Sequence, residues 1–110
     1  MSMREIENIK QCFIEHLDPL RIYLFGSSAN GTDTAASDLD FYIVVRDNAP
    51  DLADIAARAY RSIRTVRERP VDIVVGAVSR FEARKHFPSV EHEVFTQGVL
   101  LYENGNKGMA

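Results

Sequence analysis

Residues 20–45 decide the fold of this chain, and they read LRIYLFGSSANGTDTAASDLDFYIVV. The first six are mostly apolar, with aromatic and branched side chains, and Gly26 closes the run. Such a run predicts a strand buried on both faces. The following residues show no periodic apolar face until a second apolar run begins at Asp38. We therefore expect a strand, a polar loop or short helix, and a second strand over residues 38–45.

Helical periodicity flanks this segment on both sides. Ser2 and Glu5 match a capping box, and apolar residues then recur at helical spacing up to Asp18-Pro19, at Ile6, Ile9, Phe13 and Leu17. After Pro50-Asp51, a second amphipathic helix is predicted, with one face formed by Leu52, Ile55, Ala56, Ala59, Ile63 and Val66.

The remaining elements complete an α+β, two-layer pattern. Residues 71–75 predict a third strand, Ser79 with Glu82 predicts a capped helix, and Gly98 precedes a last apolar run. The predicted order is αββαβα(α)β, a small mixed sheet flanked by helices. At 110 residues we expect one domain over residues 1–103 and a flexible tail over 104–110. By default, the apolar residues Phe87, Phe95 and Leu101 are expected to pack in the core.

Composition excludes several classes of protein. Hydrophobic residues make up 45% and charged residues 26%, as in soluble globular proteins, and no run of eighteen apolar residues indicates a membrane span or signal peptide. The net charge of -3 argues against binding duplex nucleic acid. A single cysteine, Cys12, fits a reducing cytoplasm.

Three carboxylates stand at strand starts. Asp38 and Asp40 are two residues apart, so their side chains leave the same face with Cα atoms roughly 6.5 Å apart. Asp72 has the same context in the third strand. Like charges this close repel each other unless they are solvated, hydrogen-bonded or bound to a cation. Oxygen ligands favour Mg²⁺ or Mn²⁺ over zinc, so we expect magnesium paired with a nucleotide's phosphates.

Gly26-Ser27 follows the first strand directly and lets a phosphate approach the backbone closely. The combined pattern is Gly-Ser, ten residues, Asp-Leu-Asp, and the downstream Asp72. It resembles the signature of the nucleotidyltransferase superfamily that includes DNA polymerase beta. The short length resembles the minimal nucleotidyltransferase branch.

This resemblance implies an enzyme with two Mg²⁺ ions and ATP as substrate. Asp38 and Asp40 would hold both ions, with Asp72 completing the second site and accepting the proton of the acceptor hydroxyl. Ser27 and the backbone of Gly26 would hold the β- and γ-phosphates, and Ser37 would orient Asp38 or a phosphate.

The resemblance also implies a partner. Many minimal nucleotidyltransferases are antitoxins of type VII-like pairs, in which AMP is transferred to a tyrosine of a helical HEPN toxin (AMPylation). Two alternatives stay open. The chain could be a non-catalytic subunit that masks its partner, or it could transfer a nucleotide to a small molecule such as an aminoglycoside. We interpret an arginine-rich stretch as a solvated helix face, with partner binding as the alternative. It contains Arg58, Arg61, Arg64, Arg67 and Arg69.

Overall fold

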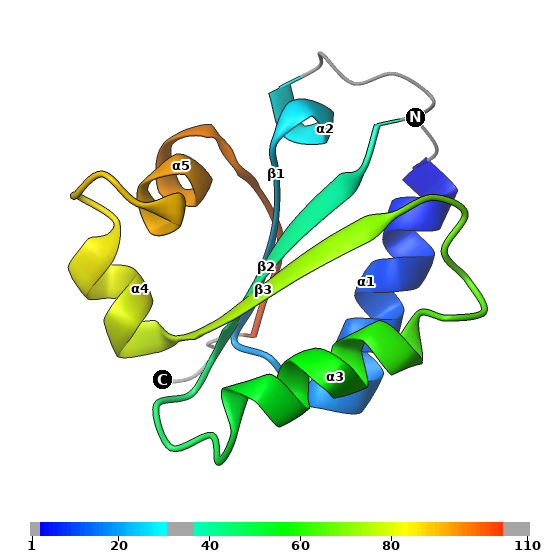
Figure 1. The fold of residues 1–110 in the computed structure, drawn as a ribbon, viewed down its shortest axis with the longest axis horizontal. Helices are drawn as coiled ribbons and strands as arrows, with labels where there is room; N and C mark the ends of the chain where they lie inside the picture. The colour runs from blue at the N-terminus through cyan, green and yellow to red at the C-terminus, as the bar shows by residue number, and fades with distance from the viewer. Residues whose placement is uncertain (1–2, 31–36, 105–110) are drawn as a thin grey trace.

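The computed structural model describes residues 3–30 and 37–104, which form a four-stranded mixed sheet with helices on both faces (Figure 1). The strands are β1 (Arg21–Phe25), β2 (Leu39–Val45), β3 (Val71–Ala77) and β4 (Val99–Glu103), in the order β3-β2-β1-β4. Strand β1 is antiparallel to β2 and β4, whereas β2 and β3 are parallel. The predicted fold class and order of elements are confirmed, with a single helical turn, α2 (Ser27–Asn30), in the polar segment.

Helices α1 (Met3–Leu17) and α3 (Leu52–Ser62) cover one face of the sheet. Side chains alternate along β2, so every second residue from Leu39 to Val45 enters this core. Phe13 meets Phe41 edge-on, with ring centroids 5.4 Å apart. The four apolar positions predicted for the first helix are all buried. Asp51 caps α3 by accepting the backbone N–H groups of residues 53 and 54.

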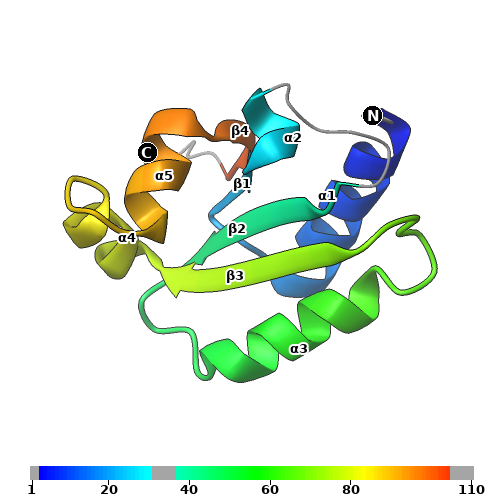
Figure 2. The ribbon, with the colours of Figure 1, turned by 45° about the horizontal axis from the view of Figure 1, so that its top comes forward.

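Helices α4 (Val78–Arg84) and α5 (Val90–Gln97) lie on the other face (Figure 2). Their core residues, Phe81 and Val94, pack with Tyr42, Val44 and Phe25. Asp40 has the same parity as Tyr42 and Val44 along β2, so it shares the face that α4 and α5 cover. Among the described residues, no helix is long and apolar enough to span a bilayer.

A buried carboxylate ties α1 to the segment before β3. Glu5 accepts the backbone N–H of Glu68 at 2.6 Å and forms an ion pair with Arg69 at 3.2 Å. In turn, the carbonyl of Pro70 accepts the N–H of Leu39 at 3.0 Å. The starts of β2 and β3 are thus held together by contacts on the α1 side.

Several sequence expectations are wrong in detail. Helix α4 begins at Val78, and Ala77 is its N-cap residue. Ser79 therefore lies inside the helix and does not cap it, and its backbone N–H donates to the Asp47 side chain. Phe87 and Phe95 are not in the core, since they are 65% and 45% exposed, and Phe95 lies against His86 and Lys85 at the surface. Strand β1 does contribute to both cores, as expected, with Ile22 and Leu24 on the α1 side and Phe25 on the α4 side, whereas Arg21 and Tyr23 are half-buried.

Both ends of the chain lie partly outside the described residues. Ser2 of the expected capping box is one such residue, and 105–110 are others. Asn104, which we assigned to the tail, donates its backbone N–H to the Leu20 carbonyl at 2.8 Å. The domain and tail boundaries remain predictions.

Replacing Phe13 tests the contribution of the α1–sheet core. Phe13→Ala removes a fully buried ring and its contact with Phe41, and should lower the free energy of unfolding by about 3–5 kcal/mol in urea denaturation. The exposed Gln11→Ala on the same helix is the control, and it should change stability by less than about 0.5 kcal/mol. Equal effects of the two substitutions would contradict the packing assigned to α1.

Candidate active site

The sheet brings the predicted aspartates to one edge. Strands β2 and β3 are parallel neighbours, and Asp40 and Asp72 are directly paired in their register. The two carboxyl groups are close enough for the Asp72 charge to raise the pKa of Asp40. Asp38 lies just before β2 and is exposed, as is Asp72. The expected proximity of all three follows from this pairing.

The Asp40 carboxyl group is the most perturbed acid in the cluster. Burial, followed by the negative charges of Asp72 and Asp38, raises its pKa to about 6. Glu93, in the first turn of α5, adds a smaller contribution. The sequence offered no signal for Glu93, because only the docking of α5 on the sheet brings it toward β2.

Gly26 lies on the β1 side of Asp40, away from Asp72 on β3. Its φ of +77° is in the left-handed region that favours glycine. Phe25 pairs with Asp40 across β1 and β2, so the next residue lies against the Asp40 side chain. A Cβ atom at Gly26 would overlap Asp40 Oδ2. The glycine predicted for close phosphate approach therefore also makes room for the carboxylate.

The two predicted serines flank this arrangement. Ser27 is the first residue of α2 and is half-buried, and Ser37 directly precedes Asp38. Ser28 was not predicted as a site residue, yet it is buried and its hydroxyl donates to the Asp38 carbonyl at 3.4 Å. This bond ties the glycine turn to the start of β2. Residues 31–36 lie outside the described part of the chain.

The donor set suits a hard divalent cation. In the described part of the chain, no three acidic, histidine or cysteine side chains are already arranged to hold a metal ion. Asp40 and Asp72 instead lie at paired positions of neighbouring strands, and after burial the charge of Asp72 is the largest influence that raises the pKa of Asp40. A divalent cation bound by oxygen ligands would offset the repulsion between the two carboxylates. Carboxylates without nitrogen or sulfur ligands favour Mg²⁺ over Zn²⁺.

Gly26→Ala should disturb both the backbone and the acidic cluster. We expect a loss of more than about 1 kcal/mol in urea denaturation, because alanine is strained at positive φ and its Cβ meets Asp40. Combining it with Asp40→Gly removes the overlap and leaves the strain, so part of the loss should be recovered. No recovery in the double variant would show that the contact with Asp40 is unimportant.

The raised pKa of Asp40 predicts how the metal-free protein responds to pH. Above about pH 6 the folded state holds a carboxylate that it disfavours, and this penalty is relieved as pH falls from about 6 to about 4. In EDTA, Asp40→Asn should therefore raise the melting temperature at about pH 7.5, and the gap from wild type should narrow by about pH 4.5. A gap independent of pH would contradict the assignment.

Known structures share this arrangement of strands and helices. A candidate nucleotidyltransferase from Sulfolobus solfataricus superposes with a TM-score of 0.64 at 20% identity, covering 92% of this chain and 79% of that one. A toxin–antitoxin structure with AMP-PNP gives 0.58 at 22% identity, covering 93% and 75%. A mutant of the toxin–antitoxin MntA-HpeT gives 0.57 at 21% identity, covering 91% and 73%.

No curated protein matches the chain in sequence. The family model described as polymerase beta, nucleotidyltransferase, matches residues 7–107, which include every predicted site residue. The match spans the glycine turn, the aspartates of β2 and the paired aspartate of β3. The chain therefore belongs to the polymerase beta nucleotidyltransferase family and is a nucleotidyltransferase.

Proposed function

We propose that this nucleotidyltransferase transfers AMP from ATP to a hydroxyl group of a partner protein, a tyrosine of a HEPN-type helical toxin, and so acts as an antitoxin. The observation that carries the proposal is the acidic cluster of Asp38, Asp40 and Asp72 beside the Gly26 turn. Burial and the neighbouring carboxylates raise the pKa of Asp40 to about 6, and a shift of this kind supports a functional site.

The proposed reaction is a single displacement at phosphorus. The acceptor oxygen forms a bond to the α-phosphorus of ATP as the bond from that phosphorus to the bridging oxygen of the β-phosphate breaks. Pyrophosphate leaves with the bonding electron pair, and the acceptor hydroxyl gives its proton to the Asp72 carboxylate. Asp72 suits this role because it is exposed at the sheet edge, whereas Asp40 is partly buried between its neighbours.

Asp38, Asp40 and Asp72 would hold two Mg²⁺ ions, and bound Mg²⁺ would neutralise phosphate charge and lower the pKa of the acceptor hydroxyl. The backbone at Gly26 and the hydroxyl of Ser27 would hold the β- and γ-phosphates, since the missing Cβ leaves room there. Ser37 would orient Asp38.

Two of the similar structures support a partner protein, because each is a toxin–antitoxin, one of them with AMP-PNP. The single half-buried thiol, Cys12, suits a reducing cytoplasm. Burial raises its pKa, which keeps it unreactive. We infer that one domain, residues 1–103, carries the activity.

A second candidate function is non-catalytic masking of the partner. Four exposed apolar side chains in or near α5 favour it, because exposed apolar surface can bind a protein without chemistry, and they are Phe87, Phe95, Val99 and Leu100. Transfer of AMP by this chain would decide between the two functions.

Substitution of the aspartates tests the catalytic proposal. Asp38→Ala and Asp40→Ala should abolish AMP transfer, and Asp72→Asn should lower kcat by about 10²-fold or more, as loss of a general base does. Transfer from α-labelled ATP to the purified product of the neighbouring gene, with Mg²⁺, is read by intact mass.

Asp54→Ala on α3 is the matched control, because it removes an exposed carboxylate that forms a long ion pair with Arg58, at 3.6 Å. It should transfer AMP at the wild-type rate. Wild-type transfer by Asp38→Ala or Asp40→Ala would refute the proposed site, whereas a stable complex without any transfer by wild type would favour masking.

A further inference from the structure

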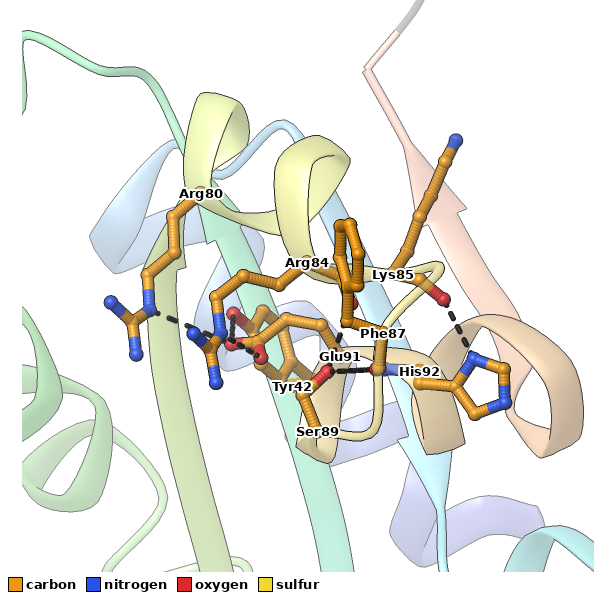
Figure 3. Close-up of polar contacts among 8 residues, drawn as sticks. All are labelled: Tyr42, Arg80, Arg84, Lys85, Phe87, Ser89, Glu91 and His92. Carbon is orange, nitrogen blue, oxygen red and sulfur yellow. Dashed lines mark hydrogen bonds and ion pairs between the residues drawn. The ribbon is translucent and has the colours of Figure 1, made fainter.

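A buried carboxylate on α5 holds two arginines of α4. Glu91 is 2% exposed and accepts the hydroxyl proton of Tyr42 at 2.7 Å. Arg84 Nε donates to Glu91 Oε1 at 3.0 Å, and Arg80 Nε forms an ion pair with Oε2 at 3.7 Å. Figure 3 shows the side chains of Tyr42, Arg80 and Arg84 converging on the Glu91 carboxylate. The acid therefore fixes two guanidinium groups from a neighbouring helix.

Glu91 contacts only the Nε edge of each guanidinium group. The contacts of Arg80 and Arg84 run through Nε, and within residues 3–30 and 37–104 their terminal Nη groups have no partner. The two side chains remain 59% and 45% exposed. In Figure 3 both groups point to the same side, over the yellow-green strand β3. Two cations on one anion leave a positive charge, with free donor pairs suited to an oxyanion.

The position of this charge relates it to the proposed site. The Tyr42 hydroxyl lies against Gly76 of β3, where a Cβ atom would overlap it. Gly76 is four residues beyond Asp72 on the same strand, a separation of roughly 13 Å. The Gly26 turn lies on the other side of Asp40, next to β1. The arginines are thus on the side of the proton acceptor, away from the turn assigned to the triphosphate.

An exposed aromatic ring lies in the turn after α4. Phe87 is three residues beyond Arg84, the last residue of α4, its N–H donates to the Arg84 carbonyl at 3.0 Å, and its side chain is exposed. Ser89 holds this turn by donating to the carbonyls of Arg84 and Phe87, both at 2.9 Å. Arginine and aromatic side chains are the residues most enriched at protein interfaces, whereas nucleic acid would meet the nearby carboxylates of the site.

We propose that Arg80, Arg84 and Phe87 form a docking surface for an acidic, partly apolar segment of the acceptor protein. Docking there would place the acceptor over β3, with its hydroxyl within reach of Asp72. The inference rests on the proposed function and names the side of the site from which the acceptor enters. Glu91 is a positioning residue, since it acts through the two arginines.

The test separates binding of the acceptor from binding of the nucleotide. Phe87→Ser and the double variant Arg80→Gln/Arg84→Gln are compared with Arg61→Gln/Arg64→Gln, which removes two exposed arginines from the α3 side. Calorimetry gives the Kd for the purified product of the neighbouring gene without nucleotide, and separately the Kd for Mg-ATP. Transfer assays give kcat and the KM for the acceptor, and circular dichroism checks that each variant is folded.

We expect both docking variants to raise the acceptor's Kd and KM at least tenfold, with the affinity for Mg-ATP and kcat at saturating acceptor within twofold of wild type. The arginine variant should also weaken the salt dependence of binding. If removal of the arginines unfolds the chain, Phe87→Ser still tests the docking surface. The Phe87 ring is already exposed, so its removal should leave the fold intact.

A weaker affinity for Mg-ATP with an unchanged acceptor KM would overturn the proposal and assign the arginines to the nucleotide. Unchanged constants in both variants, or no complex with the acceptor in the wild type, would also overturn it. If wild type binds the acceptor but transfers no AMP, the proposed function fails, whereas the Kd values still decide the docking surface.

Discussion

The parallel pairing of β2 with β3 is the constraint on which the site depends. It places Asp40 directly beside Asp72, at the roughly 4.8 Å spacing of neighbouring strands. The pairing is set by the core, since Leu39, Phe41 and Ile43 point to the α1 side while Tyr42 and Val44 point to α4 and α5. A shift of one residue would turn the aspartates to the opposite face and their apolar neighbours to the solvent.

The rest of the acidic site follows from accommodating that pair. Both carboxylates face the same side, so burial and mutual repulsion raise the pKa of Asp40. The Gly26 turn leaves space for the Oδ2 atom of Asp40. The buried Ser28 hydroxyl donates to the Asp38 carbonyl and so connects that turn to the start of β2. On the far side of the sheet, Glu5 fixes the segment that leads into β3. The fold therefore tolerates a local electrostatic cost at a place where a cation and phosphates can offset it.

Charge is separated along the face that α4 and α5 share. Carboxylates gather at the start of β2 and β3, and the two arginines held by Glu91 lie near the end of β3. Tyr42 links the two regions, because it is two residues from Asp40 and its hydroxyl donates to Glu91. An acceptor with an acidic surface would be attracted to the arginines at one end of this face and would meet the proposed catalytic aspartates at the other.

The sequence by itself determined the order of elements and the apolar faces of α1 and α3, and it supplied the aspartates and glycine that we propose for the site. These features rest on local spacing, since period-two and period-3.6 patterns and a glycine turn are properties of neighbouring residues. The tertiary structure alone decided the pairing of Asp40 with Asp72, the approach of Glu93, and the capture of Arg80 and Arg84 by Glu91. It also decided that Phe87 and Phe95 are exposed. The Asp47 carboxylate, rather than the Ser79 side chain, accepts a backbone N–H group in the first turn of α4. Each of these depends on contacts between segments far apart in the chain, and the packing of helices on a sheet leaves no mark in the local pattern of residues.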